Sequence, residues 1–200
     1  MFDLVSVDKH NIFKSGSIAI FLLCFFAAFF YSQCSHAAKA SINDIKIDKR
    51  NSHLTVSFRV EGCFTPEMEK AIKKGAQTSF TFLIQLKKIR SFWLDKNIKS
   101  LKIQHKVKYD NLKKVFLITL DERDDNPIEV SSLEDAKKLM ASVEKLELIP
   151  IDELDRGEKY TLRVKAEFER VRLPLRLEYV FIFVRLLDFT TSWYQLDFSI

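Results

Sequence analysis

Apolar and polar residues alternate along several segments of this chain, and this pattern constrains the fold more than any other feature. In the segment 54–61, LTVSFRVE, every even position is apolar and every odd position is polar. A period of two residues is typical of a strand that buries one face and exposes the other. A continuous apolar run at 115–120 is typical of a central strand. Further strands are expected at 43–48, 78–87, 101–109, 160–169 and 192–198.

Two other segments carry the start and stop signals of helices. Thr65-Pro66-Glu67 offers an N-cap hydroxyl, a proline for the first turn and an acid near the positive end of the helix, and Gly75 can end it. The second helix is expected from Ser132 to about Glu147, before Pro150. Its apolar face would consist of Leu133, Ala136, Leu139, Met140, Val143 and Leu146.

These elements predict a mainly β protein of the α+β kind. We expect an antiparallel β-sandwich or half-barrel of about seven strands, with two amphipathic helices packed on it. Only four glycines and four prolines occur in 200 residues, so no flexible linker divides residues 41–200, which we interpret as one β-rich domain. The apolar parity of the strands predicts that Phe58, Phe80, Phe82 and Phe168 are buried.

The N-terminal region indicates export. Residues 17–31, SIAIFLLCFFAAFFY, are fifteen residues without a charge, and they follow Lys9 and Lys14. Small residues in the segment 35–40, SHAAKA, provide two possible cleavage patterns, which completes the pattern of a secretory signal. A membrane-spanning helix needs about 20 apolar residues. Fifteen is short, but the uncharged Ser15, Gly16 and Ser32 could lengthen the segment, so an uncleaved anchor remains the alternative for residues 1–40. Either interpretation predicts a location in the periplasm or on the periplasmic face of the inner membrane.

Several blocks of residues resemble a known family. They are Glu61 to Ile72 (EGCFTPEMEKAI) with Gly75, Phe92-Trp93 with Asp95, Val107 to Asp110, Tyr160 to Glu169, Arg172 to Pro174, and Thr191 to Tyr194. Together they resemble bacterial domain-of-unknown-function family 4390, over most of residues 41–198. The resemblance implies an N-terminal signal or anchor and implies no catalytic residues.

No familiar pattern of catalytic or metal-binding residues stands out. After removal of residues 1–40 the remaining histidines are His53 and His105, and Cys63 is the remaining cysteine, which is few ligands for a metal site. His105 falls on the apolar face of its strand, where we expect a core or sheet-edge histidine with a hydrogen bond. Cys63 is expected to be a small buried residue. We therefore predict neither an enzyme nor a cofactor.

Positive charge is concentrated in one part of the chain. Between Lys87 and Lys114 there are ten lysines and arginines but two acids, and the whole chain has a net charge of +5. Two interpretations are open: a solvated face that discourages edge-to-edge aggregation, and a docking face for anionic lipid headgroups or an acidic partner. The residues of the possible docking face are Lys87, Lys88, Lys99, Lys102, Lys106 and Lys108. No nucleic-acid recognition motif accompanies them.

A second apolar run, 175–187, is too short to span a bilayer. It is expected to be a buried strand or core helix, or else a segment that lies against the membrane or a partner. Taken together, these features predict a non-enzymatic cell-envelope domain that binds a protein partner or the membrane surface. The alternative is a hydrolytic or small-ligand-binding domain whose site is assembled from residues distant in sequence. The sequence does not indicate the oligomeric state.

Overall fold

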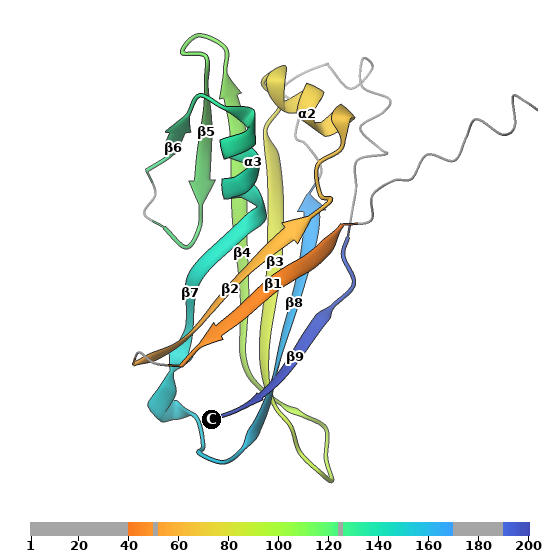
Figure 1. Cartoon of the computed structure of the whole chain (residues 1–200), viewed down its shortest axis with the longest axis vertical. Helices are drawn as coiled ribbons and strands as arrows, with labels where there is room; N and C mark the ends of the chain where they lie inside the picture. The colour runs from red at the N-terminus through yellow and green to blue at the C-terminus, as the bar shows by residue number, and fades with distance from the viewer. Residues whose placement is uncertain (1–39, 50–51, 124–125, 170–189) are drawn as a thin grey trace, which may run out of the picture. The chain divides into compact units, whose positions relative to one another are not determined.

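The computed structural model describes residues 40–49, 52–123, 126–169 and 190–200, all of which belong to one compact unit, Ala38–Ile200. These residues form two antiparallel sheets and two helices. In Figure 1 the smaller sheet crosses diagonally in front of the larger one. The expected class, a mainly β fold with two helices, is confirmed, and the described residues contain nine strands where about seven were expected.

The smaller sheet has the strand order β1-β2-β7. Its strands are β1 (Ser41–Asp48), β2 (His53–Glu61) and β7 (Ser142–Pro150). The alternation predicted for β2 is confirmed, because Leu54, Val56, Phe58 and Val60 are all buried while Arg59 and Glu61 are exposed. A short 3₁₀ helix, η1 (Ile151–Glu153), follows β7.

The larger sheet has the strand order β6-β5-β4-β3-β8-β9. Its strands are β3 (Thr78–Lys88), β4 (Lys96–Asp110), β5 (Val115–Leu120), β6 (Ile128–Val130), β8 (Lys159–Glu169) and β9 (Tyr194–Ser199). The two central strands, β3 and β4, form a long hairpin. β3 also pairs with β8, which is distant in sequence.

The first helix, α2 (Pro66–Lys73), begins as the sequence predicts. The Thr65 hydroxyl accepts a hydrogen bond of 3.2 Å from the backbone N–H of Met68, and Met68, Ala71 and Ile72 form its buried face. Gly75 has a φ of +85°, and a Cβ there would lie 2.9 Å from Nδ2 of Asn111. Glycine is therefore needed at this turn for both its backbone conformation and its lack of a side chain.

The second helix is shorter than predicted. α3 spans Leu133–Ala141, and the chain then continues directly as strand β7. Val143 lies opposite Phe58 and Leu146 lies opposite Val56 in the smaller sheet. These two apolar residues, which were expected on a helical face, are thus buried on a strand instead. The pairing also gives the backbone N–H and C=O groups of β2 hydrogen-bond partners.

One apolar core joins the two sheets and both helices. The four phenylalanines expected to be buried are buried, with exposed fractions of 3% for Phe58, 1% for Phe80, 0% for Phe82 and 6% for Phe168. Phe58 of β2 and Phe82 of β3 meet edge to face, with ring centroids 5.5 Å apart. This contact links the smaller sheet to the larger one.

Two apolar segments singled out in the sequence, 17–31 and 175–187, lie outside the described residues. Among the residues that the structure does describe, no helix has the length and apolar character needed to cross a membrane.

Candidate functional site

Three predicted lysines project from the outer surface of the larger sheet. Along β4, Ile103, His105 and Val107 are buried, whereas Lys102 and Lys108 are exposed and Lys106 is half-buried. Because successive side chains of a strand point to opposite faces, the three lysines share the face that points away from the core.

Strand pairing adds two more cations that the sequence analysis did not connect with this surface. Lys102 lies opposite Leu83 of β3, and Leu83 lies opposite Lys165 of β8. In the next outward row, Ser100 lies opposite Gln85, which lies opposite Arg163. The alternation of β8 predicted that Arg163 and Lys165 are outward, but their position beside β4 depends on the pairing of β3 with β8. We call Lys87, Lys102, Lys106, Lys108, Arg163 and Lys165 the basic face.

An aromatic side chain covers part of the basic face. The guanidinium carbon of Arg163 lies 4.7 Å from the ring centroid of Trp193, and Nζ of Lys165 lies 5.9 Å from it. Cations at these distances from an indole are attracted by its π system. Trp193, just before β9, therefore holds the two β8 cations close together.

Two carboxylates contact cations of the basic face. Glu167 accepts a hydrogen bond of 2.7 Å from Lys165, and Asp121 lies 3.9 Å from Lys106. The Asp121–Lys106 contact is partly exposed and long, and such pairs contribute little to stability.

Lys88 is placed away from the basic face. Its Nζ lies 2.8 Å from Asp155 and 3.2 Å from Glu158, in the connection between η1 and β8. The hydrogen bond to Asp155 is the main cause of a raised pKa for Lys88. This lysine therefore fastens the end of β3 to the start of β8.

Of the two remaining lysines of the predicted docking face, Lys87 lies on the basic face and Lys99 does not. Lys87 continues the outward parity of β3 beyond the buried Leu86, so it belongs to the basic face. Lys99 lies opposite Leu86, near the end of the hairpin, and is exposed. The register irregularity at this point lies on β4, where Ile98 is the extra residue between Asn97, opposite Lys87, and Lys99. The structure thus brings together Lys87, Lys102, Lys106 and Lys108, but not Lys88 or Lys99.

His105 is fully buried beneath this sheet. Its Nδ1 lies 3.1 Å from the carbonyl oxygen of Met140, and its Nε2 lies 2.9 and 3.0 Å from the two carboxylate oxygens of Glu122. The expectation of a hydrogen-bonded core histidine is confirmed. Burial by itself would raise the pKa of Glu122, but the hydrogen bond and charge of His105 outweigh burial and lower it.

Cys63 is also buried, as expected. Its thiol contacts the carbonyl oxygen of Val60 at 3.6 Å, and burial raises its pKa to about 12. A thiol with such a pKa stays protonated at neutral pH and is a poor nucleophile or metal ligand. Among the described residues, no three histidine, cysteine, aspartate or glutamate side chains cluster closely enough to hold a metal ion.

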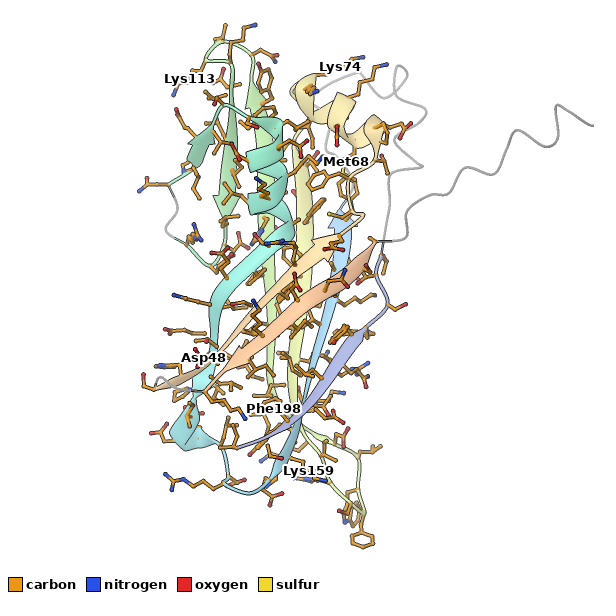
Figure 2. All side chains as sticks on the ribbon, in the orientation of Figure 1. Asp48, Met68, Lys74, Lys113, Lys159 and Phe198 are labelled. Atoms are coloured by element: carbon orange, nitrogen blue, oxygen red, sulfur yellow. The ribbon has the colours of Figure 1, made fainter. Side chains whose placement is uncertain are left out.

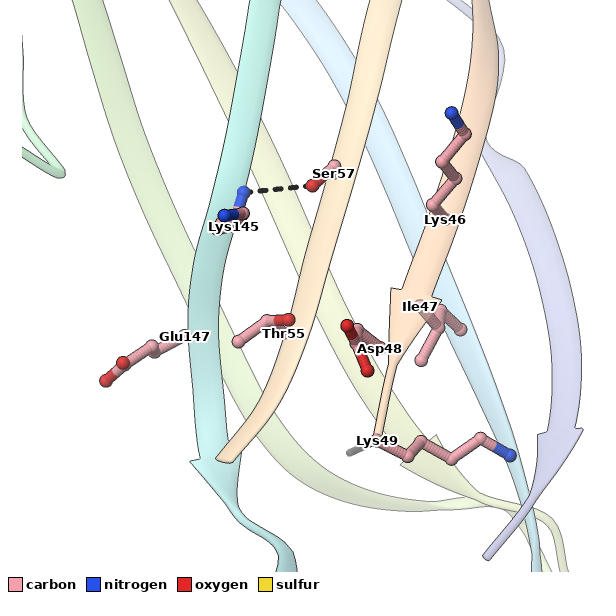
Figure 3. A pocket seen from close by; sticks show the side chains of 8 residues that line it. All are labelled: Lys46, Ile47, Asp48, Lys49, Thr55, Ser57, Lys145 and Glu147. Atoms are coloured by element: carbon pink, nitrogen blue, oxygen red, sulfur yellow. Dashed lines mark hydrogen bonds between the residues drawn. The ribbon is translucent and has the colours of Figure 1, made fainter. Parts of the chain in front are cut away.

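The smaller sheet carries an open depression on its outer side (Figure 3). It is lined by Lys46, Ile47, Asp48, Lys49, Thr55, Ser57, Lys145 and Glu147. Figure 3 shows Lys46, Lys49 and Glu147 pointing away from one another, and the backbone N–H of Lys145 donates to the Ser57 hydroxyl at 2.9 Å. Polar groups that diverge in this way do not converge on a small ligand.

These features define a protein with two facing β-sheets and a basic outer face. The chain belongs to the family described as a domain of unknown function (DUF4390), whose model matches residues 37–197. The resemblance found in the sequence is thereby confirmed. No curated protein and no solved structure matches the chain.

Proposed function

We propose that this chain is a non-enzymatic binding domain of the cell envelope, whose basic face docks onto a negatively charged surface. The observation that carries the proposal is the gathering of cations from β3, β4 and β8 on one outward sheet surface. A group of like charges on one surface attracts a partner of opposite charge, either an acidic protein or an anionic membrane.

The proposed location rests on the sequence of residues 17–31 and the small residues behind them. Export places the basic face on the periplasmic side, where membrane lipids and envelope proteins are the available partners. The side chains around the depression of Figure 3 diverge, so this depression does not favour the alternative of a hydrolytic or ligand-binding domain.

Site-specific photocrosslinking of the full chain in its native envelope tests this proposal. Gln104 lies between Lys102 and Lys106 on the outward side of β4, so a photoreactive residue at this position samples the basic face. We expect adducts with an acidic protein or anionic lipid. Since a basic residue near an anionic surface contributes about 1 kcal/mol, the K102E/K106E/K108E variant should weaken binding by roughly a hundredfold.

A matched control reverses three exposed lysines outside the basic face, in the variant K46E/K73E/K145E. This control should keep the adducts, whereas a wash at high ionic strength should remove the non-covalent complex of the wild type before illumination. Equal adduct yields from the basic-face variant and the control would contradict the proposal. In both variants folding should survive, because exposed charges contribute little to stability.

A further inference from the structure

The connection between β3 and β4 exposes three large apolar side chains in succession. The exposed fractions are 94% for Phe92, 78% for Trp93 and 92% for Leu94. Single exposed apolar residues are common on protein surfaces, but a contiguous apolar patch marks a place that contacts a partner or a membrane. We call these three residues the apolar tip.

The base of this connection is firmly attached to the rest of the sheet. The backbone N–H of Ile89 donates to the carbonyl oxygen of Lys159 at 2.9 Å, and Lys88 pairs with Asp155 and Glu158. Figure 1 shows the connection protruding from the end of the sheet, and Figure 2 shows its side chains extending beyond Lys159. The hairpin therefore holds the apolar tip away from the core.

Cations surround the apolar tip. Arg90, Lys96 and Lys99 flank it on the two arms of the hairpin, and all three are exposed. The acid in the same segment is Asp95, while Asp155 and Glu158 at the base are engaged by Lys88. We call Arg90, Lys96 and Lys99 the basic collar.

We propose that the apolar tip inserts into the interfacial layer of an anionic membrane, with the basic collar contacting the lipid headgroups. Aromatic side chains, tryptophan above all, favour the boundary between headgroups and acyl chains. Lysine and arginine gain further binding energy from anionic lipids next to such an inserted segment. A fluid headgroup layer accommodates cations spread over two hairpin arms, whereas a protein pocket must match each of them. This proposal concerns a surface separate from the basic face.

Tryptophan fluorescence of the full chain tests the proposal, because the chain has two tryptophans, Trp93 and Trp193. The W193F variant reports on Trp93, and the matched control W93F reports on Trp193. Both are reconstituted in vesicles of phosphatidylcholine with phosphatidylglycerol, and in phosphatidylcholine alone, so that residues 17–31 are common to all samples. We expect the emission of Trp93 in anionic vesicles to shift to shorter wavelength and to be quenched by lipids with brominated acyl chains.

Two further variants in the W193F background sharpen the test. Charge reversal of the collar (R90E/K96E/K99E) should abolish the difference between anionic and neutral vesicles, and F92S/L94S should reduce the shift. Since the tip side chains are exposed, F92S/L94S should melt at the wild-type temperature. The proposal is overturned if Trp93 keeps the emission of a water-exposed indole in anionic vesicles. Protection of Trp93 by an envelope protein without any vesicle response would also overturn it. None of these results depends on adducts at Gln104, so this proposal and the docking role of the basic face can fail separately.

Discussion

At the scale of single residues, the most constrained polar group is His105. A carbonyl oxygen can only accept, so Nδ1, which lies 3.1 Å from the Met140 carbonyl oxygen, must carry a proton. Nε2 lies 2.9 Å from the carboxylate of Glu122, whose side chain is only 9% exposed. These contacts join β4, the end of α3 and the turn after β5, which explains why a histidine occupies an apolar strand face.

The Glu122 carboxylate should therefore stabilise the fold in a pH-dependent way. Its pKa is lowered below the ordinary 4.5, so its contribution is present above pH 4.5 and is lost as the pH falls through the lowered pKa. We expect E122Q to lose about 1–3 kcal/mol of unfolding free energy at neutral pH. Thermal melts of both proteins should converge as the pH falls below about 4.5.

Glu144 provides the control for this measurement. It is 67% exposed and lies 3.8 Å from Arg123, so E144Q should change the stability by less than about 0.5 kcal/mol. If the difference between E122Q and the wild type were constant down to strongly acidic pH, the ionised carboxylate of Glu122 would be ruled out as its cause.

At the scale of the elements, the segments that resemble the family include residues that shape a turn or attach one strand to another. Asp110 accepts hydrogen bonds of 2.8 and 3.0 Å from the backbone N–H groups of Leu112 and Lys113, which shapes the β4–β5 turn. These bonds lower the pKa of Asp110. Thr191 exchanges two hydrogen bonds with the backbone of Ala166 and so attaches the approach to β9 to β8.

The transition from α3 to β7 is the element that sequence patterns describe least well. Between the pairs Val56–Leu146 and Phe58–Val143, the single residue Ser57 faces two residues of β7, one of which is Lys145 with a φ of +51°. This is a β-bulge, which increases the local twist of the smaller sheet.

Substitution of Lys145 by glycine distinguishes the bulge from a continued helix. A left-handed backbone costs a non-glycine residue roughly 1–2 kcal/mol, and glycine loses about 0.4–1 kcal/mol more chain entropy on folding. We expect K145G to leave the unfolding free energy unchanged or to raise it by up to about 1 kcal/mol, as measured by urea denaturation. The control K138G, within α3, should lose about 1 kcal/mol. A similar loss in both variants would contradict the bulge.

At the scale of the whole described fold, stability depends on the core shared by the two sheets. Phe82 is fully buried in this core. Its ring centroid lies 5.5 Å from that of Phe58 in the smaller sheet and 4.8 Å from that of His105. The connection between the sheets is thus made by side chains, since the hydrogen-bonded strand pairs lie within each sheet.

Substitution of Phe82 and Phe58 by alanine measures how much their contact contributes to the unfolding free energy. F82A should cost about 3–5 kcal/mol of unfolding free energy, because it removes a fully buried ring and leaves a cavity. A double-mutant cycle with F58A should give a coupling energy of about 0.5–1.5 kcal/mol. Chemical denaturation of the four proteins provides both values. Additive losses would mean that the two rings stabilise the fold independently.

The sequence alone determined which segments form most strands and which face of each strand is buried. Phe58, Phe80, Phe82 and Phe168 are buried as their parity required, and Lys102, Lys106 and Lys108 point outward together. These properties are local, because the period of side-chain direction follows from the backbone conformation of one strand.

Only the tertiary structure decided which strands are neighbours. Arg163 and Lys165 join the basic face through the pairing of β3 with β8, and Asp155 and Glu158 draw Lys88 away from it. Residues 142–147 match the predicted helical face, but in the structure they pair with the backbone of β2 as part of strand β7. The exposure of Phe92, Trp93 and Leu94 likewise depends on where the hairpin ends relative to the core. Such outcomes follow from contacts between residues far apart in the chain, which no local pattern encodes.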